Sequence, residues 1–233
     1  MSLLAELFPA SLKRLELRNC GKLEFSELNQ NVLLTSLPLQ IFLNLSHLNI
    51  SDWENLECVS FELKSLPCHM NTLLPELESL WIANCPGIKS FPEGAMPPSL
   101  RSLAIRNCKK LLRSPSLATM DMLTDLDIIG PYDGVKSFPE EGLVLLPPSL
   151  TSLYLESLQS FETLDCNGLL QQLTIANCPK LENMGGERLP ASLIKLQIWN
   201  CPLLEERCKT KHPHIWPKIS HITGIHVEDR WIS

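Results

Sequence analysis

The sequence predicts an α/β-type solenoid, a fold in which short units of similar sequence stack side by side. Three observations point to it. The segment Ile82-Ala-Asn-Cys-Pro86 recurs letter for letter as Ile175-Ala-Asn-Cys-Pro179. A wider template, L-x-x-L-x-(I/L)-x-x-C-x-x-(L/I/F), recurs through most of the chain. Proline-rich segments separate the copies, and prolines at this density oppose long helices.

The chain matches this template eight times. Most of the steps between copies fall in the range of about 20–29 residues that is typical of leucine-rich repeats. We therefore expect residues 1–204 to form a solenoid of about eight repeats and residues 205–233 to form a C-terminal cap. The copies begin at Leu12, Leu45, Leu77, Leu100, Leu123, Leu150, Leu170 and Leu193.

Each copy is expected to contain a short β-strand. In L-x-x-L-x-L the last two leucines lie two residues apart, so both point to one face of a strand. One strand cannot bury that face alone, whereas stacked repeats join their strands into a parallel sheet over a continuous core. The sequence thus predicts a leucine-rich-repeat horseshoe, with a parallel concave β-sheet and a convex side of mostly loops and short turns.

Two long steps precede the third copy, and they contain insertions near residues 26–42 and 57–74. Within the first insertion, Leu34-Thr-Ser-Leu-Pro-Leu39 is a candidate for a degenerate ninth copy. Its proline opposes a strand ladder, and Leu45 follows it too soon for a full repeat.

The ninth template position marks the turn that follows each strand. A cysteine there can pack inward while its thiol reaches a backbone carbonyl that the turn leaves unpaired. An asparagine precedes each cysteine, and we expect its amide to hydrogen-bond neighbouring main chain. Copies five and six lack both residues, which predicts a kink or a different turn. The predicted ladder is Cys20, Cys85, Cys108, Cys178 and Cys201, with Trp53, Pro131 and Leu158 in the other copies.

The outward residues of the strands form the candidate binding surface. Equivalent positions of neighbouring repeats come about 4.8 Å apart in such a sheet. Aromatic side chains there are of the kind that anchors interfaces, although they could also merely coat the sheet. Charge is uneven, with arginines in copies one and four and carboxylates in copies five and six, which suits a partner of opposite polarity or simply a solvated surface. The predicted protein-binding residues are Arg14, Arg18, Asn49, Trp81, Arg106, Asp127, Tyr154, Gln197 and Trp199.

Composition excludes several classes of partner. A net charge of −6 and a pI near 5.5 argue against nucleic acid or an anionic membrane as the main partner. No apolar run approaches the roughly 20 residues of a membrane span, and the first residues do not resemble a secretory signal. Nine cysteines without C-x-x-C pairs fit reduced thiols. We therefore expect a cytoplasmic protein with a protein partner; the oligomeric state stays open.

The C-terminal tail offers a possible metal site and a possible catalytic thiol. Its candidate ligands fit none of the zinc-finger spacings. Cys178 or Cys208 with a histidine could be imagined as a thiol and a base, but no third group is indicated. We therefore expect no enzyme, no metal and no cofactor. The candidate metal ligands are Cys208, His212, His214, His221 and His226.

Together these features resemble the C-terminal leucine-rich repeats of plant intracellular disease-resistance proteins, the coiled-coil, nucleotide-binding, leucine-rich-repeat receptors. The resemblance rests on the L-x-x-L-x-I-x-N-C-P units at Leu77, Leu170 and Leu193, on the P-x-S-L lead-ins, and on the ending Pro213-His-Ile-Trp-Pro-Lys-Ile-Ser-His-Ile222. It implies a pathogen-sensing module that also restrains a neighbouring nucleotide switch. The implied partner is a pathogen effector, a host guardee or an intramolecular nucleotide-binding domain, in the cytoplasm or the nucleus.

The chain departs from that family in two ways. It shows no upstream coiled coil and no G-x-x-x-x-G-K-(S/T) phosphate loop, so nucleotide binding cannot be assigned to it. Because the first copy comes soon after Met1, we expect a fragment of a longer chain. The alternative is a stand-alone adaptor or decoy, such as the substrate-binding part of a ubiquitin ligase, although no ligase-recruiting segment is visible. A secreted receptor is disfavoured because the G-x-I-P form of extracellular repeats is absent.

Overall fold

The computed structural model describes residues 11–20, 44–56, 74–91, 96–112, 115–132, 134–138, 146–166, 168–186 and 189–232. The candidate ninth copy at Leu34 and nearly all of the two insertions lie outside these residues. The chain forms two compact units, Met1–Leu123 (unit 1) and Thr124–Ser233 (unit 2). Their boundary falls inside the tract of predicted repeats.

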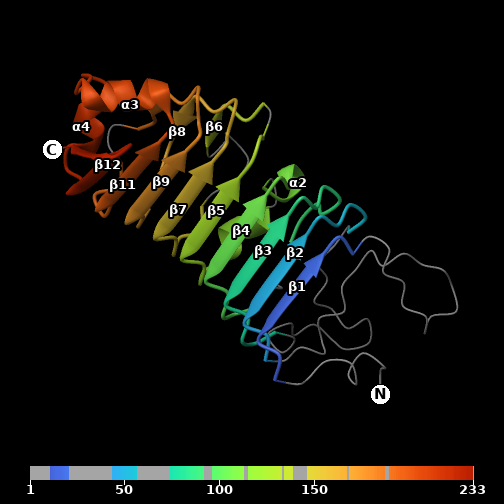
Figure 1. Ribbon diagram of the computed structural model, residues 1–233. Coiled ribbons are helices and arrows are strands. Elements are labelled where there is room, and N and C mark those ends of the chain that lie inside the picture. The colour runs from blue at the N-terminus through green and yellow to red at the C-terminus, as the bar shows by residue number, and fades with distance from the viewer. Residues whose placement is uncertain are drawn as a thin grey trace, which may run out of the picture. The chain divides into compact units, whose positions relative to one another are not determined.

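Every predicted repeat contains a five-residue strand that begins two residues after its first leucine. Within each unit these strands pair in parallel (Figure 1), so the predicted parallel sheet is confirmed. Unit 1 contains β1 (Arg14–Arg18), β2 (His47–Ser51), β3 (Ser79–Ala83) and β4 (Ser102–Arg106). Unit 2 contains β5 (Asp125–Ile129), β7 (Ser152–Glu156), β9 (Gln172–Ala176) and β11 (Lys195–Trp199).

The strand register places equivalent template positions directly opposite one another. Leu80 of β3 lies between Leu48 of β2 and Leu103 of β4. In unit 2, Leu173 of β9 lies between Leu153 and Leu196 in the same way. All of these leucines are buried, and each contributes roughly 1.5–3 kcal/mol to stability. The leucines of β1 are only half-buried.

The turn after each strand explains why asparagine recurs at the eighth template position. This residue has a positive φ in all eight repeats, a conformation that glycine, asparagine and aspartate adopt most readily. The chain then closes a short turn, as when the N–H of Ile88 donates to the carbonyl of Cys85 at 3.3 Å. The eighth-position residues are Asn19, Asp52, Asn84, Asn107, Gly130, Ser157, Asn177 and Asn200.

Copy five carries a different turn, as expected, but its ninth position is not Pro131. Pro131 is exposed and is an additional residue, while Tyr132 is buried. The N–H of Val135 donates to the carbonyl of Tyr132, which is the bond that other repeats form from their ninth position. Copy six keeps the ordinary turn, with Ser157 at positive φ and Leu158 buried.

Where the structure describes the segments that follow the turns, they are mostly loops with short regular elements among them. In unit 2 three two-residue strands form a second parallel sheet in the order β10-β8-β6. Their second residues, Phe138, Leu164 and Met184, are buried. These elements are β6 (Ser137–Phe138), β8 (Thr163–Leu164) and β10 (Asn183–Met184), with helix α2 (Lys109–Leu112) and 3-10 helix η3 (Pro115–Thr119) in unit 1.

The C-terminal segment closes unit 2 with two helices and two further strands, α3 (Pro202–Lys209), α4 (Trp216–Ile219), β12 (Gly224–Val227) and β13 (Arg230–Ile232). β12 pairs in parallel with β11, and β13 pairs antiparallel with β12 (Figure 1). The Arg207 guanidinium donates to the Glu182 carbonyl at 3.0 Å, and the Lys218 ammonium donates to the Met184 carbonyl. Side chains of the cap thus donate hydrogen bonds to the main chain at β10, an outer strand of the small sheet.

The sequence predicts only a cap for residues 205–233, whereas β12 within it continues the repeat. Ile222, Ile225 and Val227 repeat the L-x-x-L-x-L spacing and are buried. The helices in the described part of the chain are all too short or too polar to cross a membrane.

Candidate protein-interaction face

The third, fifth and seventh template positions point away from the core, so each sheet has an outward face. Strand pairing aligns these positions in rows that run across the strands. The nine predicted binding residues divide between the units. Unit 1 carries Arg14, Arg18, Asn49, Trp81 and Arg106, and unit 2 carries Asp127, Tyr154, Gln197 and Trp199.

On unit 1, Trp81 lies between Asn49 and Ala104 in one row. Ala104 is buried and Trp81 is half-buried. In the next row, Arg18 and Arg106 flank two small residues, one of which is Ser51. The hydroxyl of Ser51, which is 7% exposed, meets no hydrogen-bond partner among the described residues. Small residues thus lie between the two arginines in the second row, whereas in the first row Ala104 lies beside Trp81 at the end of the row.

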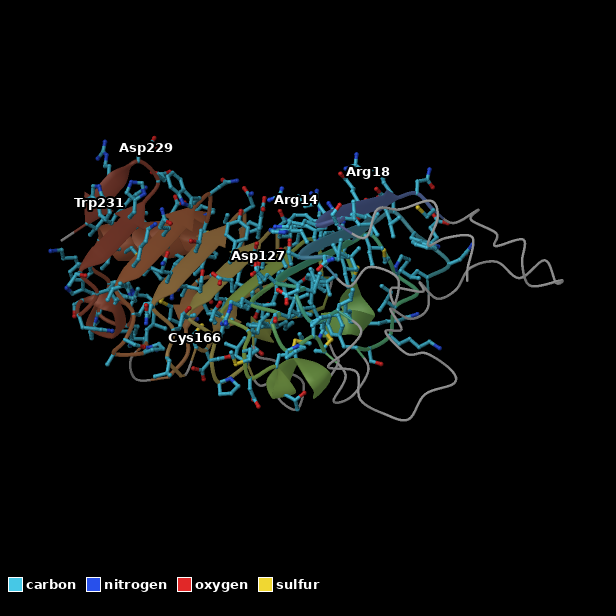
Figure 2. The ribbon with its side chains drawn as sticks, turned by 90° about the horizontal axis from the view of Figure 1, so that it is seen from below. Arg14, Arg18, Asp127, Cys166, Asp229 and Trp231 are labelled. Carbon is cyan, nitrogen blue, oxygen red and sulfur yellow. The ribbon has the colours of Figure 1, made fainter. Side chains whose placement is uncertain are left out.

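Arg14 and Arg18 lie on β1, where Figure 2 labels both of them. The Arg18 guanidinium donates to Glu16 at 2.8 Å, and both side chains are well exposed. Exposed pairs of this kind contribute at most about 1 kcal/mol, so this pair does not fix the arginine firmly. Arg106 on β4 is exposed as well. Arginine therefore occupies both outer strands of the unit 1 face.

The face of unit 2 is acidic at β5 and β7. Asp125 and Asp127 lie on the same side of β5, and Asp127 pairs in register with Tyr154 of β7. The Tyr154 hydroxyl donates to Glu156 at 2.8 Å. Burial, with the Asp125 charge, raises the pKa of Asp127. Burial and the hydrogen bond to Glu156 raise the pKa of Tyr154 to about 12. Burial is the main cause of both shifts, and the neighbouring carboxylates add to them.

The opposite end of this face is aromatic. The Trp199 and His226 rings lie 4.9 Å apart between centroids, and His226 meets Trp231 edge-on at 5.1 Å. Trp231 is 70% exposed, and Figure 2 shows it at the far end of unit 2 from Asp127. Between these ends Gln197 accepts a hydrogen bond from Thr174 at 3.4 Å. A pocket of about 540 Å³ is lined by Trp199, Lys209, Glu228, Asp229 and Arg230.

Two features of the surface differ from the expectation. Trp81, Tyr154 and Trp199 are half-buried rather than fully exposed, because neighbouring side chains cover part of each ring. Trp231 is the only exposed tryptophan, tyrosine or phenylalanine among the described residues, and it was not among the predicted binding residues. The signal that could have found it is the I-x-x-I-x-V spacing, which predicts a strand just before the tryptophan.

The cysteine ladder has the same geometry in all five copies. Each thiol donates to the carbonyl two residues earlier, at 3.2–3.6 Å. In addition, the N–H of Cys85 donates to the sulfur of Cys108 at 3.3 Å, and the N–H of Cys178 donates to that of Cys201 at 3.4 Å. The ladder therefore links neighbouring repeats as well as closing each turn.

The eighth-position side chains form a second ladder. Asn107 donates to Asn84 at 2.7 Å, and Asn84 donates to Asp52 at 2.7 Å. In unit 2, Asn200 donates to Asn177 at 2.8 Å, and Asn177 donates in turn to Glu156 at 3.1 Å. These amides bond other side chains, whereas the sequence analysis expected them to bond main chain.

The candidate thiols Cys178 and Cys208 are buried, and two of the candidate metal ligands, His212 and His214, are neighbouring rings. The hydrogen bond with Cys201 and burial raise the pKa of Cys178, and burial raises that of Cys208 to about 12, so both thiols stay protonated at neutral pH. His212 and His214 lie 5.5 Å apart between ring centroids. Within the described part of the chain, no three His, Cys, Asp or Glu side chains are grouped to hold a metal ion.

Comparison with known proteins links the chain to a plant protein. The chain matches no protein-family model. It is 29% identical to the Arabidopsis thaliana protein named "Putative disease resistance protein At3g14460", over 85% of this chain and 18% of that protein. The chain thus spans less than a fifth of the length of this relative. Its stacked parallel repeats are similar to part of a plant protein whose name refers to disease resistance.

Proposed function

We propose that this chain is the protein-binding leucine-rich-repeat module of a plant intracellular immune receptor. It recognises a pathogen effector, a host protein that such an effector modifies, or a nucleotide-binding domain of its own parent protein, which it holds inactive. The similarity to the Arabidopsis thaliana protein supports the link to defence. The repeat form supports binding, because stacked strands present a long surface to a partner.

The observation that carries the proposal is the composition of the outward faces. Half-buried aromatics lie beside small buried residues, as Trp81 does beside Ala104 and Trp199 beside Ala176. Tyrosine and tryptophan in such settings supply most of the binding energy in protein interfaces. Arginines on unit 1 and carboxylates on unit 2 add charge that can select a partner.

This role is binding rather than catalysis, and it belongs inside the cell. The free thiols of the ladder serve the turns, since each donates to a carbonyl of its own repeat. A partner is then held by contact area and charge, without any cofactor.

A binding screen tests the proposal. The chain would serve as bait against a library of secreted pathogen proteins and plant nucleotide-binding domains, beside the variant Trp81→Ala, Tyr154→Ala, Trp199→Ala. We expect the chain to capture at least one of these proteins, with affinity at least tenfold weaker in the triple variant. Both proteins should show the same circular dichroism spectrum.

The matched control replaces three exposed residues beyond the strands, as Lys89→Ala, Gln159→Ala, Lys180→Ala. This variant should bind as the original chain does. Capture that survives in the aromatic variant would assign binding to another surface, and the absence of any partner from both libraries would contradict the proposed role.

A further inference from the structure

The outward face of unit 2 contains one row in which a small residue lies between a carboxylate and an indole. Glu156 of β7, Ala176 of β9 and Trp199 of β11 pair in register. Neighbouring strands lie about 4.8 Å apart, so the backbones of Glu156 and Trp199 are roughly 10 Å apart across Ala176. Ala176 is 7% exposed, although its methyl group is much shorter than the side chains on either side.

The side chains of Glu156 and Trp199, on either side of Ala176, are both in contact with other residues. Glu156 accepts one hydrogen bond on each oxygen, from the Tyr154 hydroxyl and from the Asn177 amide. A carboxylate has about four acceptor positions, so each oxygen can still accept a further donor. The Trp199 ring is in contact with His226, which belongs to β12 on the side away from Ala176. The side chains of Glu156 and Trp199 are therefore positioned before any partner binds.

Charge in this region is predominantly negative. The outward positions of β5, β7, β9 and β11 carry three carboxylates, Asp125, Asp127 and Glu156, and one cation, Lys195. Among the described residues, none of these carboxylates forms a salt bridge. A cationic group placed near Glu156 would meet this negative charge, whereas at the Trp199 end of the row both cations and carboxylates line the neighbouring pocket.

We propose that the Glu156–Ala176–Trp199 row takes an arginine side chain of a protein partner. The guanidinium would lie over Ala176, stack against the Trp199 ring and donate to the free acceptor positions of Glu156. Arginine fits better than lysine, because its planar group can stack on an aromatic ring and bond a carboxylate with two parallel hydrogen bonds. This inference rests on the proposed function and names the chemistry of the partner.

A peptide titration tests the row directly. The probe is acetyl-Gly-Gly-Arg-Gly-Gly-amide, and its control is the same peptide with citrulline, which has nearly the same shape without the charge. The full chain, labelled with ¹⁵N and ¹³C, is titrated while the Trp199 indole N–H and the Ala176 methyl signals are followed by NMR. We expect saturable shifts with the arginine peptide and at least fivefold weaker binding of the citrulline peptide.

Variants separate this row from general attraction to an acidic protein. Glu156→Gln removes the charge, and Ala176→Leu places a longer side chain between Glu156 and Trp199, so each should weaken binding of the arginine peptide at least fivefold. Glu206→Gln, at an exposed position of α3, removes the same charge elsewhere and should bind normally. Thermal melts confirm that each variant is folded.

The proposal would be overturned by equal binding of the two peptides, or by normal binding in both Glu156→Gln and Ala176→Leu. The two experiments together distinguish failure of the arginine site from failure of the proposed binding function. If the aromatic triple variant loses its captured partner while the arginine peptide shifts nothing, the row is rejected and the module is retained. Binding of the peptide without any captured protein would support the row and reject the wider role.

Discussion

The side-chain carboxylate of Glu205 accepts a hydrogen bond from the backbone N–H of Cys201 at 2.8 Å. In the preceding repeat the equivalent N–H, that of Cys178, has a different acceptor, because it donates to the sulfur of Cys201 in the next repeat. Glu205 is 5% exposed and lies on α3. The Glu205 carboxylate therefore accepts, after the last Asn-Cys repeat, the hydrogen bond that the sulfur of the next cysteine accepts in the preceding repeat.

Replacing Glu205 with alanine should lower the free energy of unfolding by about 1–3 kcal/mol, because it leaves the buried N–H of Cys201 without an acceptor. Urea unfolding followed by circular dichroism measures the change. Glu205→Gln should retain most of the stability, since its amide oxygen can still accept the bond. Glu206→Ala, at the exposed neighbour, should change stability by less than about 0.5 kcal/mol. An equal effect of the two alanine variants would contradict this account.

Removing a core leucine should be far more costly than removing a surface leucine of the same unit. Leu173 is fully buried, whereas Leu169 is 63% exposed. We expect Leu173→Ala to lower the free energy of unfolding by about 2–5 kcal/mol. Leu169→Ala should stay within about 0.5 kcal/mol of the original chain. The same urea titration measures both, and similar midpoints would argue against a continuous leucine core in unit 2.

At Asn177 the backbone conformation and the side-chain bonds can be tested separately. Its φ of 54° strains any residue with a Cβ except those that tolerate this region, such as asparagine. Asn177→Ala adds strain and removes the bonds with Glu156 and Asn200, so we expect a loss of about 1–3 kcal/mol. Asn177→Gly removes the bonds without the strain and should lose less. Thermal unfolding ranks them, and a glycine variant less stable than the alanine variant would refute the argument.

Asp127 should destabilise the fold at neutral pH. Its pKa is raised in the folded state, so the folded chain binds more protons than the unfolded chain, and stability falls as pH rises through the interval above the ordinary value of 3.8. Below that value both states are protonated and the penalty is absent. Asp127→Asn should therefore raise the melting temperature at pH 7, and the gain should vanish at pH 3. A lower melting temperature at pH 7 would show that Asp127 has a compensating partner.

The strands could be predicted from the sequence because their signal is local. Leucine and isoleucine at fixed spacing mark the inward positions of each strand, and all eight predicted strands are present. The strand at Gly224–Val227 was missed because isoleucine and valine replace leucine, and no Asn-Cys pair follows. The two-residue strands such as Ser137–Phe138 are too short to show any periodicity, although Lys-Ser-Phe-Pro recurs in the chain.

The candidate surface was predictable only in part. The pattern indicates which residues point outward, but it does not tell how far their neighbours cover them. Trp199 is half-buried because His226 comes from a strand that the template did not identify. Likewise, the bond from Asn200 to Asn177 depends on the register between repeats, which no single repeat encodes.

The antiparallel direction of β13 determines how copies of unit 2 can associate. A head-to-tail stack of solenoids needs a parallel strand at both free edges, each offering the same register of leucines to the next molecule. At this end the edge strand runs the other way and presents Arg230 and the ring of Trp231. A second copy that continued the parallel ladder would meet a strand of opposite direction here, so β13 gives the sheet of unit 2 a different edge from the parallel strands that it follows.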